Sequence, residues 1–144
     1  MENEVKVYLA ARYSRRNELR VYRADLETLG FAVTSRWLDG NHQIDDAGLS
    51  EEGSAAERTR FAQEDWDDLM EADACISFTE SPRSAASRGG RHVEFGAGVA
   101  AGKFMVVIGP RENVFHCLPE VAVFPDWPTY LIHISSVQAE GQAN

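Results

Sequence analysis

The 144-residue chain has only two cysteines, Cys75 and Cys117. Two thiols in a chain of this length do not make a disulfide framework, and we expect both to be small buried hydrophobic residues. Neither belongs to a CxxC pair, and the four histidines are too scattered to suggest a metal site. The sequence therefore predicts neither a bound metal nor a fold held by disulfides.

Basic residues are also scarce. Lys and Arg total 14 against 23 Asp and Glu, which gives a formal net charge of −9. Such a surface repels duplex DNA and anionic lipid, so we expect no nucleic acid polymer and no membrane as a partner. No apolar run approaches the ~18 residues of a membrane span. The acidic start Met1–Glu4 lacks the apolar core of a signal peptide, and we expect a cytoplasmic protein.

Short apolar segments alternate with segments of helical period along the chain. Strands are expected at Val5–Ala10, Phe31–Ser35, Ala74–Phe78, Phe104–Ile108 and Tyr130–Ile134, and helices at Ser14–Leu29, Arg58–Glu71, Arg91–Gly102 and Asn113–Leu118. Gly30 suits the left-handed position that ends a helix. The strands at Ala74 and Phe104 lack an alternating pattern, which is typical of a parallel sheet covered on both faces.

We expect one domain over residues 1–136 and a disordered tail over 137–144. The polar stretch Asp39–Glu57 is long for a connection and is either a lid or a binding loop. In parallel sheets, ligands bind beyond the carboxyl ends of the strands, where the strand order reverses. Three segments fall at those ends: Ala11–Arg16, Thr79–Arg91 and Gly109–Phe115.

Glu94 is the first candidate for chemistry. It follows the pair Gly89-Gly90, and we place it in the first turn of a helix, where the helix dipole favours an ionised carboxylate. The alternative is an acid that serves the helix dipole alone. The small residues that follow, from Gly96 to Gly102, suit close packing of this helix against a sheet.

Asp65 is the second candidate. It lies between Phe61 and Leu69 at a spacing of four residues, beside the apolar stripe of its helix. The alternative is an acid at the edge of that stripe with a purely structural partner. Two carboxylates at the strand ends suit displacement at an anomeric carbon, where one attacks and the other assists the leaving group.

Arginines gather near two of the expected strand ends, and they are Arg12, Arg15, Arg16, Arg20, Arg88 and Arg91. They could hold one phosphate, or they could simply pair with nearby acids. No GxxxxGK[ST] or GxGxxG motif accompanies them. Tyr8, Tyr13 and Trp37 could stack a base, or they could pack in the core.

Three segments resemble the nucleoside 2-deoxyribosyltransferase family, which includes the nucleoside 5′-monophosphate N-glycosidases. They are Val7–Ser14, Gln63–Trp66 with Ala72–Asp73, and Gly89–Gly96 with Gly102–Lys103. The resemblance runs from about Val5 to Leu118. It implies a flavodoxin/Rossmann-like three-layer sandwich with a mostly parallel, about five-stranded sheet. It also implies a homodimer or higher homo-oligomer with shared active sites.

The resemblance also implies roles for individual residues. Glu94 becomes the nucleophile, Asp65 the acid near base and sugar, and Tyr8 the residue that positions the nucleophile. Tyr13 would line the base pocket, and His116 would reach into the site of a neighbouring subunit. Arg88 stands where the transferases often carry an acid, and Arg12 replaces a small residue. Both departures favour a phosphorylated substrate.

The sequence thus predicts cleavage of the N-glycosidic bond of a (deoxy)nucleoside 5′-monophosphate through a covalent glycosyl-Glu94 intermediate, without a cofactor. Arg12, Ser14 and Arg88 would hold the phosphate. The full predicted substrate-binding set is Ala11, Arg12, Tyr13, Ser14, Trp37, Arg88, Gly90, Asn113 and His116. The alternatives are a transferase that exchanges bases between deoxynucleosides, a non-catalytic nucleotide-binding module, and a cleaver of a dinucleotide such as NAD.

Overall fold

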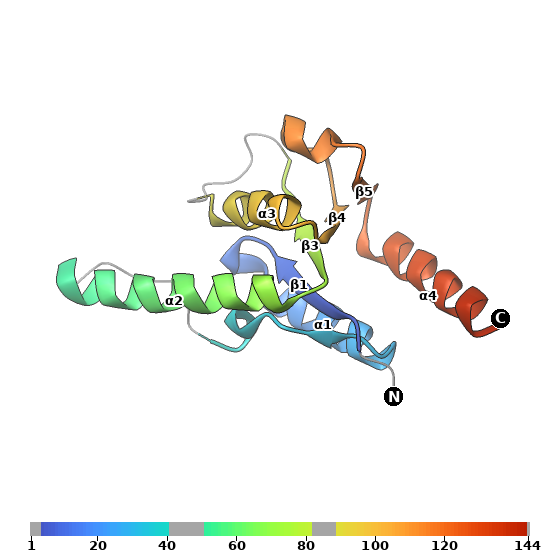
Figure 1. Ribbon diagram of the computed structural model, residues 1–144, viewed down its shortest axis with the longest axis horizontal. Helices are drawn as coiled ribbons and strands as arrows, with labels where there is room; N and C mark the ends of the chain where they lie inside the picture. Colours follow the sequence, from blue (N-terminus) through green and yellow to red (C-terminus); the bar gives the residue numbers. More distant parts are fainter. Residues whose placement is uncertain (1–3, 41–50, 82–88, 144) are drawn as a thin grey trace.

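The computed structural model describes residues 4–40, 51–81 and 89–143. Its centre is a five-stranded, entirely parallel sheet in the order β2-β1-β3-β4-β5 (Figure 1). The strands are β1 (Lys6–Ala10), β2 (Ala32–Val33), β3 (Ala74–Phe78), β4 (Phe104–Ile108) and β5 (Val121–Phe124). The order reverses between β1 and β3, which places the switch point there. The predicted flavodoxin/Rossmann-like fold class is confirmed.

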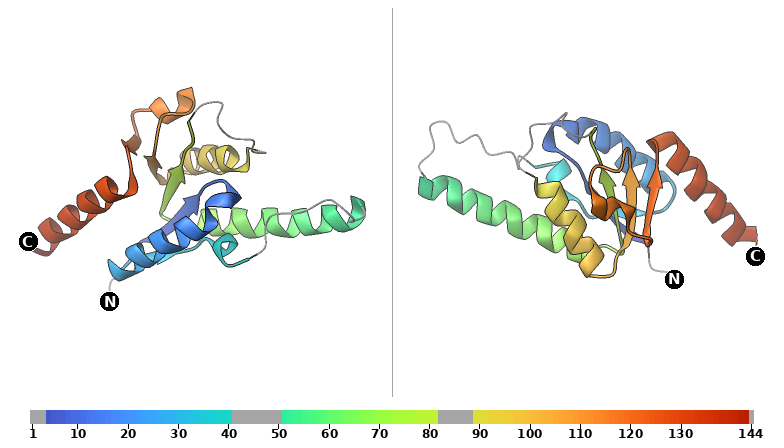
Figure 2. Two further views of the ribbon diagram at one scale, coloured as in Figure 1. Left: turned by 180° about the vertical axis from the view of Figure 1, so that it is seen from behind. Right: turned by 90° about the horizontal axis from the view of Figure 1, so that it is seen from above.

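Helices cover both faces of the sheet, as the right-hand view of Figure 2 shows. They are α1 (Arg16–Thr28), α2 (Glu51–Glu71), α3 (Gly90–Ala100) and α4 (Trp127–Ala143), with the short 3-10 helices η1 (Tyr13–Arg15), η2 (Arg36–Leu38) and η3 (Val114–Cys117). The helices α2 and α3 lie on one face, and α1 and α4 lie on the other.

Each face packs through a different kind of contact. On the α1 side, Tyr22 stacks on Phe78 of β3 at 5.5 Å and on Trp127 of α4 at 4.5 Å between ring centroids. On the α3 side, a Cβ added to Gly98 would lie 2.9 Å from the Met105 sulfur of β4. The expected close approach of this glycine-containing helix to the sheet is therefore confirmed at Gly98. Gly30 ends α1 with φ at 95°, as expected.

The last strand was predicted in the wrong place. It is β5, Val121–Phe124, and Tyr130–Ile134 belongs to α4. The Asp126 side chain accepts a hydrogen bond from Thr129 N at 2.9 Å and so caps this helix, while Tyr130 and Ile134 are buried one helical turn apart. Residues 137–143, where the sequence analysis places a disordered tail, continue the same helix.

The structure corrects two further sequence-based expectations, one on the loop after Asp39 and one on the cysteines. Residues 51–57 of the predicted loop Asp39–Glu57 are helical in α2, whereas 41–50 lie outside the described residues. Cys75 is buried as expected, but Cys117, the last residue of η3, is exposed. In the part of the chain that the structure describes, no helix is both long and apolar enough to cross a membrane.

Candidate active site

A hydrogen-bonded pair of side chains joins β1 to α3. Tyr8, in the middle of β1, is fully buried, and its hydroxyl donates to Glu94 Oε2. Glu94 lies in the second turn of α3, because the helix begins at Gly90 and its first turn carries no acid. The predicted first-turn position is therefore wrong. Tyr8 is paired in the sheet with Cys75 of β3, so the Glu94 carboxyl faces the strands on either side of the switch point.

The environment of Glu94 favours the neutral acid. Burial raises its pKa to about 8, and the negative charge of Asp65 adds to the rise, while the hydrogen bond from Tyr8 opposes it. The sequence-based expectation is a carboxylate kept ionised by the helix dipole, and burial acts against that ionised form. Burial, followed by the charge of Glu94, also raises the pKa of the Cys75 thiol.

Asp65 approaches the same pair from α2. Burial raises its pKa to about 7, and the charges of Asp68 and Glu64 contribute. Asp68 is itself buried and held by Arg36, whose backbone N and Nε both donate to it at 2.9 Å. Asp65 in turn raises the pKa of both Tyr8 and Glu94. The structure therefore brings the three residues predicted to be catalytic into one electrostatically coupled group.

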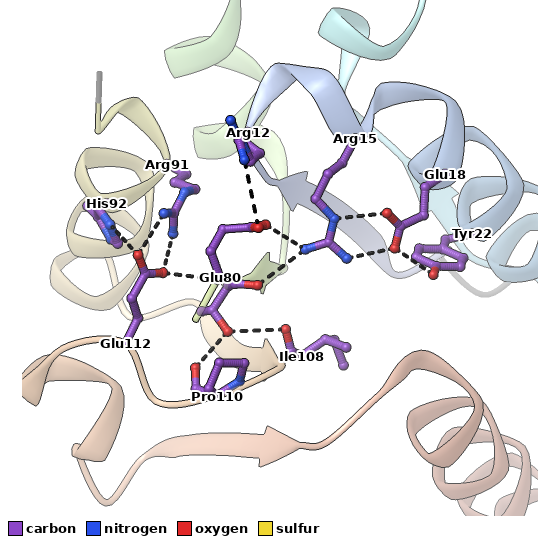
Figure 3. A network of polar contacts seen from close by, with 11 residues as sticks. Arg12, Arg15, Glu18, Tyr22, Glu80, Arg91, His92, Ile108, Pro110 and Glu112 are labelled. Carbon is purple, nitrogen blue, oxygen red and sulfur yellow. Dashed lines mark hydrogen bonds and ion pairs between the residues drawn. The ribbon is translucent and has the colours of Figure 1, made fainter. Parts of the chain in front are cut away.

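A second group of charges lies where β1, β3 and β4 end (Figure 3). Arg15, just after β1, donates two hydrogen bonds to Glu18 at 2.9 and 2.6 Å and one to Glu80 at 3.0 Å. It also donates to the Thr79 carbonyl at 3.2 Å. Arg12 Nη1 lies 4.0 Å from the other Glu80 oxygen. The carboxylate of Glu80 thus faces two arginines from the first loop.

The same group reaches α3 through Glu112, which follows β4. Arg91 of α3 donates two hydrogen bonds to Glu112, at 2.5 and 2.7 Å, and these hold the pKa of that carboxyl down to about 2. Glu112 Oε1 also accepts from Glu80 N at 3.1 Å. His92 Nε2 lies 3.6 Å from Glu112 Oε2. Three strand ends and the first turn of α3 are therefore tied together by side chains.

The substrate-binding residues predicted in the first loops differ in their burial and in their contacts. Ala11 and Arg12 are partly buried at the end of β1, and Ser14 is exposed. The Tyr13 hydroxyl accepts from Arg16 at 2.6 Å, and the Arg16 guanidinium also lies over the Tyr13 ring. Trp37 is buried, and its indole N–H donates to the Leu9 carbonyl at 2.9 Å, which favours the core role that the sequence left open.

The remaining predicted residues lie around α3 and η3. Gly90 is the exposed first residue of α3. Asn113 caps η3 by accepting from Phe115 N at 3.0 Å, and its amide lies 3.4 Å from His92 Nδ1. Arg88 lies outside the described residues.

The resemblance implies that His116 reaches into the site of a neighbouring subunit, whereas this residue is only 1% exposed within its own chain. Nδ1 accepts from the backbone N of Glu112 at 2.9 Å and of Asn113 at 3.3 Å, and the ring packs edge-on against Phe95. Burial lowers the pKa of His116, in keeping with a neutral ring that orders the turn after β4.

Sequence reasoning missed Glu80 and Glu112. Glu80 lies two residues beyond β3, and Glu112 lies four residues beyond β4. Ligands of parallel sheets bind beyond the carboxyl ends of the strands, and this rule points to these two acids as well as to the neighbouring arginines. Among residues 4–40, 51–81 and 89–143, no cluster of His, Cys, Asp and Glu could hold a metal ion.

No protein-family model and no curated protein matches the sequence. Solved structures do match the fold. The 2-deoxyribosyltransferase from Bacillus psychrosaccharolyticus has a TM-score of 0.66 at 22% identity, over 88% of this chain and 90% of that one. The CMP N-glycosidase of Clostridium botulinum has a TM-score of 0.55 at 21% identity, over 92% and 98%.

A conserved protein from Enterococcus faecalis V583 has a TM-score of 0.58 at 14% identity, over 93% of this chain and 99% of that one. At such identities these likenesses establish a shared fold. They agree with the architecture that the sequence predicted, over nearly the full length of each chain.

Proposed function

We propose that this chain is an enzyme that breaks the N-glycosidic bond of a nucleoside or nucleoside 5′-monophosphate, with Glu94 as the nucleophile. The observation that carries the proposal is the partly buried Glu94 carboxyl, held by the Tyr8 hydroxyl and coupled to Asp65 beside the switch point of the sheet. Two solved proteins of this fold, a 2-deoxyribosyltransferase and a CMP N-glycosidase, carry names that denote chemistry at that bond.

In the proposed reaction the ionised form of Glu94 is the reactive one, and its carboxylate oxygen attacks C1′ of the sugar and forms an ester. The bond from C1′ to the base nitrogen breaks, and its electron pair stays on the base. Asp65, with its pKa near 7, is partly protonated at neutral pH and can give the departing base a proton. Water then attacks C1′ and gives one proton to Asp65, the C1′–Glu94 ester bond breaks, and the sugar leaves with the Glu94 carboxylate regenerated.

The raised pKa of Glu94 fits this role. A carboxylate that is poorly solvated in the empty site is stabilised when positive charge develops at the anomeric carbon, so its interaction is stronger in the transition state than in the free enzyme. The Tyr8 hydroxyl fixes which oxygen is presented, and it opposes the rise in the pKa of Glu94 that burial causes. Tyr8 is thus a positioning residue for the nucleophile.

The test is release of free base from a panel of deoxynucleosides, ribonucleosides and their 5′-monophosphates, followed by chromatography. We expect at least one member to be cleaved, and we expect Glu94→Gln to lower that rate by about a thousandfold or more. Glu71→Gln is the matched control, because Glu71 is an exposed acid paired with Lys6 at the start of β1. Cleavage that survives Glu94→Gln would contradict the proposal.

A transferase is the second candidate, and the fold shared with a 2-deoxyribosyltransferase favours it. Here a second base, in place of water, attacks C1′ of the glycosyl-Glu94 ester. Supplying a different free base with the substrate separates the two reactions. A new nucleoside or nucleotide indicates transfer, and sugar or sugar phosphate alone indicates hydrolysis.

A further inference from the structure

Glu80 occupies a position between two arginines at the carboxyl edge of the sheet. Its Oε2 accepts from Arg15 Nη1 at 3.0 Å, and its Oε1 lies 4.0 Å from Arg12 Nη1. All three side chains are partly buried, which weakens screening by solvent. Figure 3 shows the carboxylate lying between the two guanidinium groups. A carboxylate in this position lies against both arginines, as a bound anion would.

Among the described residues, the formal charges of this network balance. Arg12, Arg15 and Arg91 contribute three positive charges, and Glu18, Glu80 and Glu112 contribute three negative ones. Three of the arginines that the sequence places near a phosphate, Arg12, Arg15 and Arg91, are therefore already paired with acids of the chain. A phosphate dianion brought to this edge must displace Glu80 or lie beside it, and either route costs electrostatic energy.

This network adjoins the proposed catalytic group. Arg12 comes four residues after Tyr8 in the chain, and Glu80 comes two residues after the end of β3, the strand that pairs with β1. Arg91 and Glu94 share α3, and Glu112 links Arg91 to the backbone of Glu80. A sugar with C1′ at Glu94 would extend from between β1 and β3 toward these strand ends.

We infer that Glu80 is a specificity-determining residue, which substitutes for a substrate phosphate and directs the site toward sugars with a free 5′-hydroxyl. A hydroxyl can donate a hydrogen bond to Glu80, whereas a phosphate dianion presents only acceptors to it. As a statement about substrates, this inference rests on the proposed function. As a statement about anion binding, it rests on the network alone. It revises the sequence-based preference for 5′-monophosphates that was drawn from Arg12.

The test compares the wild type with Glu80→Gln, which keeps the shape of the side chain and removes its charge. We expect the ratio of kcat/KM for a deoxynucleoside 5′-monophosphate to that for the matching deoxynucleoside to rise by about tenfold or more. Glu71→Gln removes the same charge far from this edge and should leave the ratio unchanged. An equal ratio in wild type and Glu80→Gln overturns the inference.

Binding of inorganic phosphate, measured by calorimetry, tests the anion site without any catalysis. Glu80→Gln should bind phosphate about tenfold more tightly than the wild type, and the added change Arg12→Gln should abolish the gain. If no substrate is cleaved but this gain appears, the proposed function fails and the anion site stands. If cleavage occurs and the gain is absent, the anion site fails. Glu80→Ala repeats the comparison should the Gln variant not fold.

Discussion

At the scale of single residues, the most informative feature is a carboxyl group whose pKa is raised by burial. Glu94 titrates near pH 8 in the folded chain, against an ordinary value of 4.5. The folded state therefore holds this proton more tightly than the unfolded state does. The resulting stability is fully present below about pH 4.5 and is lost as the pH rises through about 8. Asp65, raised to about 7, acts in the same direction.

We accordingly expect the free energy of unfolding of the wild type to fall between pH 5 and pH 8.5 by more than that of Glu94→Gln, which cannot titrate. Urea titrations of both proteins at the two pH values measure the difference. Glu71→Gln, which alters an exposed acid, should follow the wild type. If Glu94→Gln and the wild type show the same pH dependence, Glu94 is ionised in the folded chain at neutral pH.

The sequence singles out Glu94, Tyr8 and Asp65 as candidates, but it does not predict the pKa shifts that the fold produces at Glu94 and Asp65. The segments that carry them are recognisable by motif and spacing, whereas the pKa of Glu94 depends on packing against a tyrosine 86 positions away in the chain. Desolvation of this kind arises only when the sheet and helices come together. The ion pairs of Arg15 and Arg91 could not be predicted from the sequence either, because their partners Glu80 and Glu112 come from other strand ends.

At the scale of elements, the two glycines in the interior of α3, Gly96 and Gly98, have opposite surroundings. A Cβ on Gly96 would meet nothing within 4 Å among the described residues, whereas a Cβ on Gly98 would lie 2.9 Å from Met105 Sδ and 3.0 Å from its Cε. Alanine in a helix is favoured over glycine by roughly 0.8–1 kcal/mol. At Gly98 this gain is opposed by the cost of moving Met105 in a close-packed layer.

We therefore expect Gly96→Ala to raise the free energy of unfolding by about 0.5–1 kcal/mol and Gly98→Ala to give no gain or a loss. Urea unfolding of both variants beside the wild type supplies the measurement. The two substitutions lie two positions apart in one helix, so each is the control for the other. Equal stabilisation by both would contradict this expectation and would mean that the Met105 side chain moves aside without cost.

The elements themselves were predictable where a single pattern dominates. The apolar runs of β3 and β4 coincide with the expected bounds, because strands buried on both faces have no competing period. The prediction for the end of the chain was wrong because Tyr130–Ile134 is apolar enough to resemble a buried strand. Two helix signals were present, Asp126 as a cap and Pro128 in the first turn of α4. The strand β5 was missed because it is only four residues long.

At the scale of the whole molecule, apolar side chains remain exposed near the candidate site. On α3 and η3 these are Val93, Val114 and Phe115, the last 62% exposed. The two elements are joined by the contact of His92 with Asn113 and of Phe95 with His116. Exposed apolar side chains on adjoining elements are typical of a surface that another chain covers. The homo-oligomer that the sequence resemblance implies would use such a surface, and His116 beneath it would support the turn without crossing to the partner.

The oligomeric state can be tested at this surface. We expect light scattering after gel filtration to give a mass of two chains or more, and we expect Phe115→Asp to reduce it to one chain. Phe104→Asp is the matched control, because Phe104 is also exposed, at 78%, but lies at the start of β4, away from the strand ends that carry the candidate site. If the active site is shared, Phe115→Asp also loses cleavage activity while its thermal unfolding stays cooperative. A wild type that elutes as a single chain, or a Phe104→Asp variant that dissociates as readily as Phe115→Asp, would contradict the assignment of this surface, since exposure alone would then explain the result.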